Sequence, residues 1–271
     1  MKIFCILSDE RVYSSKSPAM FSRVLQRVGI QGFYVPFKVD PKQLGQAVQS
    51  LRVLNIAGAN VTVPFKETVI PYLDVLSEGA NIIGAINTIV RNGDSLKGYN
   101  TNAIGFMDAL NDVGFEVAGK TALVCGTGGA AKAVVFMLNW LRAATIRVAG
   151  RNPDKTNEIV NRFEGEAYSF EELLERPVSA DIVVNATSVS SPQESPEMAA
   201  LIQRLQLTGC QLVIDLNYGR NSNFWQEMAR QNGVRFMDGL SALAFQAKRT
   251  FALWTRVQVA PEEFLNALQA E

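Results

Sequence analysis

The stretch that decides the fold is Thr121-Ala122-Leu123-Val124-Cys125-Gly126-Thr127-Gly128-Gly129-Ala130-Ala131. Its apolar start predicts a buried strand, and the sequence after the glycines predicts a helix through Leu141. The spacing G-x-G-x-x-A is that of dinucleotide-binding turns, in which glycine lets the backbone approach a pyrophosphate at a helix N-terminus. We therefore predict a Rossmann lobe whose cofactor contacts include Gly126, Thr127, Gly128, Gly129 and Ala130.

The next predicted strand, 144–149, distinguishes between the two nicotinamide dinucleotides. A site for NAD carries a carboxylate at the tip of this strand, where it binds the ribose hydroxyls. Here the tip is followed by Gly150-Arg151-Asn152-Pro153-Asp154-Lys155, with no acid at the tip itself. Arg151 and Lys155 lie one helical turn apart and suit a 2′-phosphate, so NADP is favoured over NAD.

Strand and helix patterns alternate along the whole chain. Strands are predicted over 2–7, 32–39, 56–63, 121–125, 144–149, 181–185 and 211–216, and a hairpin over 87–99. Helices are predicted over 19–28, 41–54, 100–112, 240–254 and 261–268. This alternation predicts an α/β protein built from βαβ units with mainly parallel sheets. Asn185, Thr187 and Ser188 follow the end of a predicted strand, where ligands bind in such sheets, and we assign them to the nicotinamide side.

A lysine stands at the end of the third predicted strand, in Asn60-Val61-Thr62-Val63-Pro64-Phe65-Lys66. Pro64 has no amide hydrogen, so strand pairing should end there, and Pro64 can open a helix over 65–68. Lys66 therefore lies at a strand-to-helix corner, with Asn60 and Thr62 just upstream. Taken alone it would more often be a solvated surface lysine, because lysine side chains are almost always exposed.

The composition excludes several classes of function. The 271 residues are 48% hydrophobic and 19% charged, and Lys+Arg balance Asp+Glu at 26 each. Because there is no basic surplus, we expect no nucleic-acid partner and no membrane partner. The N-terminal apolar run is too short for a signal peptide, and no stretch approaches the length of a membrane span.

The cysteine and histidine content bounds the redox compartment and the metal chemistry. Three widely spaced cysteines in apolar runs indicate reduced thiols of a cytoplasmic protein: Cys5, Cys125 and Cys210. The chain has no histidine, which removes the commonest general base and the commonest metal ligand. We therefore expect no metal site.

Several stretches, taken together, resemble the shikimate dehydrogenase family. Besides the glycine-rich turn and the Lys66 corner they are Ser15-Lys16-Ser17-Pro18, Gly84-Ala85-Ile86-Asn87-Thr88, Gly98-Tyr99-Asn100-Thr101-Asn102 with Gly105-Phe106, Asn185-Ala186-Thr187-Ser188, and Asp238-Gly239-Leu240 with Gln246-Ala247. They occur in the order of the family and cover essentially the whole chain.

This resemblance implies a domain organisation and an activity. An α/β substrate lobe, 1–102, would be completed by returning C-terminal helices, 239–271, and an NADP-binding Rossmann lobe would occupy 103–238. The active site would lie in the cleft. Enzymes of the family interconvert 3-dehydroshikimate and shikimate with NADP, in aromatic amino acid and chorismate biosynthesis. We expect a small ring hydroxy acid as partner, while the oligomeric state stays open between a monomer and a homodimer.

The resemblance also assigns roles to residues. Lys66 matches the catalytic lysine that exchanges a proton with the reacting oxygen. Residues that match substrate contacts are Ser15 and Ser17 for the carboxylate, with Tyr218 as a third contact, and Thr62, Asn87 and Gln246 for the ring hydroxyls. Gly239 joins the cofactor-binding set.

The sequence departs from the family at the position that pairs with the lysine. The family has aspartate where this chain has Asn102, and an amide can neither carry charge nor accept a proton. Loss of the carboxylate should lower the pKa of Lys66, and loss of an acid–base partner costs about 10²–10⁴-fold in rate. We therefore expect substrate binding with reduced turnover.

Two smaller departures bear on the choice of substrate. Ser14 replaces a frequent histidine, and Ser241-Ala242-Leu243 replaces Gly-Met-Leu. They leave open quinate or another ring acid as substrate. A non-catalytic protein that binds NADP or a ring acid is a further alternative, favoured only by Asn102.

Overall fold

The computed structural model describes residues 1–175 and 179–269, and the chain forms two compact units. Unit 1 comprises Met1–Gly105 and Leu243–Glu271, and unit 2 comprises Phe106–Ala242. The chain passes between the units inside two helices, α4 (Thr101–Asp112) and α10 (Gly239–Thr255). The boundaries expected from the sequence, after 102 and before 239, fall a few residues earlier at both crossings.

Unit 1 contains a six-stranded sheet in the order β2-β1-β3-β5-β6-β4. Its strands are β1 (Lys2–Ser8), β2 (Gly32–Lys38), β3 (Gly58–Val61), β4 (Val75–Leu76), β5 (Thr88–Asn92) and β6 (Ser95–Tyr99). β1 pairs parallel with β2 and β3, whereas β5 runs antiparallel to β3 and β6. The predicted hairpin is therefore confirmed, and it turns at Gly93 with φ of 60°.

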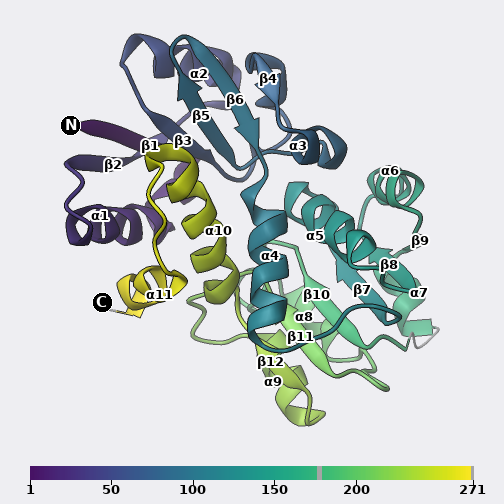
Figure 1. Ribbon diagram of the computed structural model, residues 1–271. Coiled ribbons are helices and arrows are strands. Elements are labelled where there is room, and N and C mark those ends of the chain that lie inside the picture. Colours follow the sequence, from purple (N-terminus) through teal and green to yellow (C-terminus); the bar gives the residue numbers. More distant parts are fainter. Residues whose placement is uncertain (176–178, 270–271) are drawn as a thin grey trace. The chain divides into compact units, whose positions relative to one another are not determined.

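Helices cover both faces of this sheet (Figure 1). They are η1 (Glu10–Ser14), α1 (Ser17–Arg27), η2 (Pro41–Gln43), α2 (Leu44–Val53), η3 (Ile70–Tyr72), α3 (Glu78–Ile83) and α11 (Pro261–Gln269), with the larger part of α10. The apolar stripe of α2 packs with Cys5 and Leu7 of β1. On the alternate side of β1, Phe4 stacks on Trp254 of α10 at a centroid distance of 4.8 Å.

Trp254 ties the last part of the chain to the first sheet. A Cβ atom on Gly58 of β3 would lie 2.1 Å from Trp254 Nε1, so the indole occupies the space that a side chain on Gly58 would need. The same nitrogen donates a hydrogen bond to the Ile89 carbonyl at 2.9 Å. Phe21 of α1 packs on the ring at 5.3 Å. The helix α10, which returns from the C-terminal part of the chain, thus completes the packing on this face of the sheet of unit 1.

Unit 2 contains a fully parallel six-stranded sheet in the order β12-β11-β10-β7-β8-β9. Read from its other edge, this is the Rossmann order 3-2-1-4-5-6. Its strands are β7 (Thr121–Cys125), β8 (Thr145–Ala149), β9 (Glu166–Tyr168), β10 (Ile182–Asn185), β11 (Leu212–Asp215) and β12 (Arg235–Met237).

The helices of unit 2 connect these strands (Figure 1). They are α5 (Gly129–Trp140), α6 (Pro153–Phe163), α7 (Phe170–Glu175), α8 (Pro196–Ile202) and α9 (Phe224–Gln231), with most of α4. α7, α8 and α9 bury their apolar residues in one cluster around the fully buried Trp225. Of the helices in the part of the chain that the structure describes, none has the length and apolar character needed to cross a membrane.

The corner at Pro64 differs from its prediction. β3 ends at Val61, and no helix begins at Pro64. Instead the Phe65 amide donates to the Thr62 carbonyl at 2.8 Å, closing a turn around the proline. The Ser8 hydroxyl donates to the Val63 carbonyl at 2.6 Å, which fixes this turn to the end of β1. A side-chain contact from β1, which no local sequence pattern could indicate, therefore helps to hold the corner in this turn.

Replacing Gly58 by alanine should destabilise unit 1, because the new methyl group would collide with a packed and hydrogen-bonded indole. Overpacking of this kind costs about 1–3 kcal/mol in the free energy of unfolding, which urea denaturation measures. Gly79→Ala in α3 is the matched control, because nothing lies within 4 Å of its Cβ position. That control should leave the stability equal or higher. Equal effects of the two substitutions would contradict the packing argument.

Candidate functional site

The glycine-rich turn has the geometry expected of it. β7 ends at Cys125, Gly126 has φ of 120°, and α5 begins at Gly129. A Cβ on Gly126 would lie 2.9 Å from the carbonyl carbon of Ala186, in the loop after β10. Glycine is therefore required at 126 both by the backbone conformation and by this close approach.

The N-terminus of α5 is open to a ligand. Gly128 is the N-cap residue and provides no side-chain hydrogen bond, so the amides of the first helical turn are not capped by it. Nothing lies within 4 Å of the Cβ position of Gly128. Uncapped amides and the helix dipole together favour a phosphate group at this point. Thr127 and Ala130 flank the same turn.

The tip of β8 lies against this turn. A Cβ on Gly150 would lie 2.4 Å from Cγ2 of Thr127 and 2.6 Å from Oγ1 of Thr156, so these two side chains occupy the space. Arg151 and Lys155 follow and are both exposed. Asn152, between them, caps α6 by accepting a hydrogen bond from the Lys155 amide at 3.1 Å.

The two cations at this tip are available for an anion. Within the described residues, neither Arg151 nor Lys155 forms a side-chain hydrogen bond or an ion pair. Lys132 of α5, which the sequence analysis did not single out, is buried and pairs with Glu158 of α6 at 2.7 Å. The hydrogen bond from Lys132 lowers the pKa of the Glu158 carboxyl. This ion pair joins the helix that follows the glycine turn to the helix that carries Lys155.

The loop after β10 is held by its own side chains. The buried Asn185 accepts hydrogen bonds through Oδ1 from the amide and hydroxyl of Thr187, at 3.0 and 2.7 Å. Its Nδ2 donates to Asp215 Oδ1 at 2.8 Å. Ser188 is exposed. Asn185 and Thr187 thus shape the loop with their side chains, and their contact with a cofactor stays a prediction.

Gly239 and Tyr218 belong to the neighbouring part of unit 2. The Gly239 amide donates to the Asn217 carbonyl at 3.0 Å, and a Cβ on Gly239 would lie 2.2 Å from the Leu216 carbonyl oxygen. Tyr218, in the same loop, is partly buried. It lies in a different unit from Ser15 and Ser17, with which it was predicted to bind a carboxylate.

In unit 1, Asn87 is the centre of a polar cluster. Its Oδ1 accepts the backbone amide of Thr101 at 2.7 Å, and this bond fixes which way the Asn87 amide group faces. Its Nδ2 then donates to Thr101 Oγ1 at 2.8 Å, Asn102 Oδ1 at 2.9 Å and Gln246 Oε1 at 3.0 Å. The structure therefore brings together three predicted site residues: Asn87, Asn102 and Gln246.

The cluster rests on buried hydroxyl groups that the predicted site did not include. Thr88, Thr101 and Thr250 are buried, and each of their hydroxyls lies within 3.1 Å of the other two. Thr101 lies between Asn100 and Asn102 in a motif of the family, and this position could have marked it as a site residue. For Thr250 the sequence offered only its spacing of four residues from Gln246, which places both on one face of a helix. Because this network forms hydrogen bonds to the side chains of Asn87 and Gln246, buried partners hold these two side chains in position.

Lys66 follows the Pro64 turn and is connected to the same cluster through the backbone. Its carbonyl accepts the Ile86 amide at 2.8 Å, one residue before Asn87. The side chain is partly exposed, and desolvation by the surrounding protein lowers the pKa of Lys66 to about 8. Within the described part of the chain the ammonium group has no carboxylate partner and no hydrogen-bond acceptor.

The remaining predicted substrate contacts lie on neighbouring elements of unit 1. The Thr62 amide donates to the Leu7 carbonyl at 3.2 Å, which places Thr62 at the end of β1. Ser15 Oγ accepts the Ser17 amide at 3.2 Å, and Ser17 is the buried first residue of α1. Among the described residues no hydrogen bond joins these serines to Asn87, so their common role stays a prediction.

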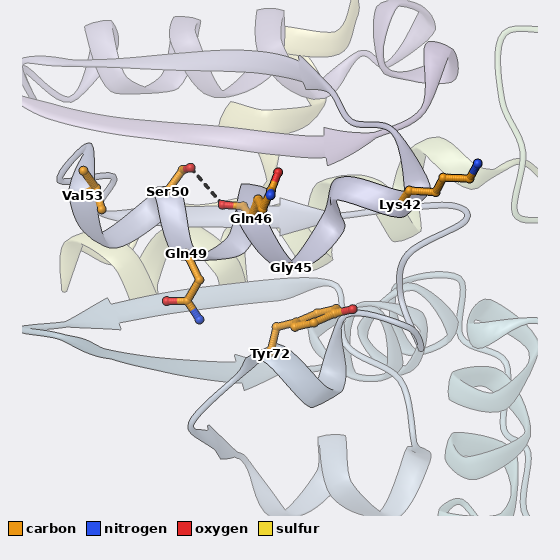
Figure 2. A pocket seen from close by; sticks show the side chains of 7 residues that line it. All are labelled: Lys42, Gly45, Gln46, Gln49, Ser50, Val53 and Tyr72. Atoms are coloured by element: carbon orange, nitrogen blue, oxygen red, sulfur yellow. Dashed lines mark hydrogen bonds between the residues drawn. The ribbon is translucent and has the colours of Figure 1, made fainter.

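A surface hollow of about 510 Å³ lies elsewhere on unit 1, along α2 (Figure 2). It is lined by Lys42, Gly45, Gln46, Gln49, Ser50, Val53 and Tyr72, and contains none of the predicted site residues. The Tyr72 ring lies against Gly45. Over residues 1–175 and 179–269, no group of three or more cysteine, aspartate or glutamate side chains is arranged to hold a metal ion.

Comparison with known proteins covers both units. Residues 8–89 match the family model of the shikimate dehydrogenase substrate binding domain, and residues 109–241 match that of shikimate / quinate 5-dehydrogenase. The NADP(+) shikimate dehydrogenase of Desulforamulus reducens is 36% identical over 276 residues, which cover 98% of this chain and 94% of that protein. The enzyme of the same name from Caldanaerobacter subterraneus is 37% identical, with coverage of 94% and 91%.

The fold agrees as well. The crystal structure of shikimate 5-dehydrogenase from Thermus thermophilus, in complex with NADP(H) and shikimate, superimposes with a TM-score of 0.86 at 32% identity and covers 99% of each chain. These matches confirm the family that the sequence motifs indicated. The chain therefore belongs to the shikimate dehydrogenase family of oxidoreductases.

Proposed function

We propose that this chain is an NADP-dependent dehydrogenase that interconverts 3-dehydroshikimate and shikimate. The observation that carries the proposal is the Asn87–Asn102–Gln246 cluster in the same unit as a lysine whose pKa is lowered to about 8. Relatives at 36–37% identity that bear this name support it. Residues 1–102 and 239–271 would bind the substrate, and residues 103–238 would bind NADP.

Lys66 is the residue that we assign to proton exchange. A lysine with a pKa near 8 has substantial populations of both protonation states close to neutral pH. It can therefore donate a proton to the reacting oxygen when the ketone is reduced, and accept the proton of the hydroxyl when shikimate is oxidised. Desolvation is what lowers its pKa, since no carboxylate among the described residues lies near enough to favour the ammonium form.

The other predicted polar residues would bind the ring acid. Ser15 and Ser17, at the start of α1, supply hydroxyl groups for the carboxylate, and Tyr218 of unit 2 would be a third contact. Thr62, Asn87 and Gln246 would face the ring hydroxyls. Asn87 and Gln246 are held by buried partners, so they would meet the substrate with little loss of side-chain entropy.

Unit 2 has the groups that NADP requires. Bound NADP would supply or accept the hydride. The amides at Gly126–Ala130 would receive the pyrophosphate, and Arg151 with Lys155 would bind the 2′-phosphate. The second half of the sheet would receive the nicotinamide side, at Asn185, Thr187, Ser188 and Gly239.

Asn102 is expected to reduce turnover without preventing binding. Because its Oδ1 accepts from Asn87, its Nδ2 remains as a donor, whereas a carboxylate at 102 would offer an acceptor and a negative charge. The donor suits oxygen acceptors on the substrate. The matching family model names quinate beside shikimate, so quinate or another ring acid is the alternative substrate.

Restoring aspartate at position 102 should raise the turnover with shikimate on the order of 10²-fold, because the carboxylate regains both charge and proton-accepting capacity. NADP reduction measured with shikimate and with quinate, for this chain and for Asn102→Asp, gives the gain and the preferred acid. Lys66→Met is the control and should abolish turnover of both acids. Absence of shikimate-dependent turnover in both proteins, with NADPH still bound, would refute the shikimate assignment.

The pH dependence should follow Lys66. Oxidation of the hydroxyl needs the neutral amine, so kcat/KM should rise as the pH increases through about 8 and then level off. Reduction of the ketone needs the ammonium form and should fall over the same interval. In Asn102→Asp the midpoint should move upward, because a nearby carboxylate favours the charged lysine. A profile that is flat around pH 8 in both directions would exclude Lys66 as the proton-exchanging group.

Removal of either exposed cation, Arg151 or Lys155, should weaken the binding of NADP and leave the binding of NAD unchanged. Arg151→Ala or Lys155→Ala should raise the KM for NADP by about tenfold to a hundredfold each, the effect of a lost hydrogen bond to a charged group. The KM for NAD, which has no 2′-phosphate, should stay within about twofold in the same assay. Equal losses for both cofactors would place the 2′-phosphate elsewhere.

A further inference from the structure

Asp215 is a buried carboxylate whose side-chain partners are all neutral. It ends β11 and is 0% exposed. Its Oδ1 accepts hydrogen bonds from Asn185 Nδ2 at 2.8 Å, the Asn217 amide at 3.0 Å and Asn217 Nδ2 at 3.1 Å. Its Oδ2 accepts from Asn223 Nδ2 at 2.6 Å. Among the described residues Asp215 has no ion-pair partner. Burial raises the pKa of Asp215, and these donors oppose the rise.

The donors around Asp215 come from different segments. Asn185 ends β10, Asn217 lies in the loop after β11, and Asn223 is the N-cap of α9. Asn223 uses its Oδ1 to accept the Trp225 and Gln226 amides, so its Nδ2 is the group that must face Asp215. One carboxylate thus joins the ends of two adjacent strands to the start of a helix.

These bonds continue to the backbone of Thr187. The Thr187 amide donates to Asn185 Oδ1 at 3.0 Å, and the Thr187 carbonyl accepts from Asn217 Nδ2 at 2.9 Å. Both asparagines are bound to Asp215. The amide and the carbonyl of Thr187 are therefore each bound by an asparagine side chain that also binds the Asp215 carboxylate.

Thr187 and Ala186 in turn lie against the glycine-rich turn. A Cβ on Gly126 would lie 2.9 Å from the Ala186 carbonyl oxygen and 3.0 Å from the Thr187 amide nitrogen. The carboxyl ends of β7 and β10 meet here, at the point where the strand order of the sheet reverses. In sheets of this order the second half, here β10 to β12, receives the second nucleotide of a dinucleotide.

We propose that Asp215 is a positioning residue that holds the loops after β10 and β11 in the conformation that binds the nicotinamide half of the dinucleotide. The inference rests on the proposed use of NADP and adds to it a residue that does not touch the cofactor. It separates the cofactor site into two parts. The adenosine half would depend on Gly126–Ala130, Arg151 and Lys155, and the nicotinamide half on the Asp215 network.

Asp215→Asn tests the negative charge at nearly constant size. The new amide can keep its oxygen toward Asn185 and Asn217, but its nitrogen then faces Asn223 Nδ2, and two donors meet. Asn223 cannot rotate to accept without losing its cap on α9. We expect the Kd for NADPH to rise about tenfold and kcat to fall, as for loss of a buried charge-assisted hydrogen bond.

The Kd for 2′,5′-ADP, which contains only the adenosine half, should stay unchanged in Asp215→Asn. This ligand separates positioning from general damage, because a purely structural role would move the melting temperature alone or weaken both ligands together. Ser222→Ala is the matched control. It removes an exposed hydrogen bond of 3.1 Å between Ser222 and Gln193, which joins the same two loops. It should change neither affinity.

The double variant Asp215→Asn/Asn223→Asp should rescue the first. The carboxylate at 223 can accept from the new amide and still cap α9, since aspartate is a good N-cap residue. NADPH affinity and kcat should return to within about threefold of the original protein. Asn223→Asp alone sets two carboxylates face to face and should show the same selective loss of NADPH, which keeps the test usable if Asp215→Asn does not fold.

The outcomes separate this inference from the proposed function. If the unchanged protein binds neither NADPH nor 2′,5′-ADP, the proposed function fails. If it binds both, and Asp215→Asn and Asn223→Asp leave the ratio of the two Kd values unchanged, the positioning role fails and NADP use stands. Selective loss of NADPH without rescue in the double variant also overturns the role assigned to the Asp215–Asn223 bond.

Discussion

One hydrogen bond, from the Thr101 amide to Asn87 Oδ1 at 2.7 Å, orients the polar cluster around Asn87 in unit 1. Because a backbone amide can only donate, it fixes the oxygen of Asn87 and therefore turns Nδ2 toward Asn102 and Gln246. These two side chains must then present their oxygens to Asn87. An amide and a carboxylate at position 102 would therefore present the same oxygen to Asn87. They would differ in the second atom, which is the Nδ2 donor of Asn102 here and would be an oxygen acceptor in aspartate.

Two ionisable side chains, Asp215 and Lys66, differ in the hydrogen-bonding partners that compensate for their desolvation. Asp215 is surrounded by amide donors from Asn185, Asn217 and Asn223, which compensate for the loss of water. Within the part of the chain that the structure describes, Lys66 has no such partners, and desolvation lowers its pKa. The first arrangement favours a fixed geometry, whereas the second favours a group that gains and loses a proton readily.

The sequence predicted correctly those elements whose conformation depends mainly on neighbouring residues. β7 and the glycine-rich turn were placed correctly because the strand, the turn and the helix each have their own sequence signature. The prediction of a helix that begins at Pro64 was wrong. The chain forms a turn there instead, which the hydroxyl of Ser8, 55 residues away from Val63 in the sequence, helps to hold. β4, β9 and β12 were missed because strands of two or three residues show no periodicity.

The same limit applies to the candidate site. Asn87 and Gln246 are 159 residues apart, so no spacing rule could bring them together, and only the family resemblance assigned both to one substrate site. Asp215 was passed over as part of an apolar strand. An acid at the end of such a run is itself unusual, since aspartate is almost never fully buried without a partner. That signal was present in the sequence.

The packing of Trp254 over Gly58 has a consequence for the order in which the two units can fold during synthesis. Unit 2 is one continuous segment, Phe106–Ala242, whereas the sheet of unit 1 lacks Trp254 until the last part of the chain is added. On the ribosome, the first hundred residues emerge with an open apolar face, and the Rossmann sheet can close before that face is covered. Residues 1–105 are therefore made before unit 2 and residues 243–271 after it, so unit 1 waits longer than unit 2 for its final packing and keeps apolar surface exposed in the meantime.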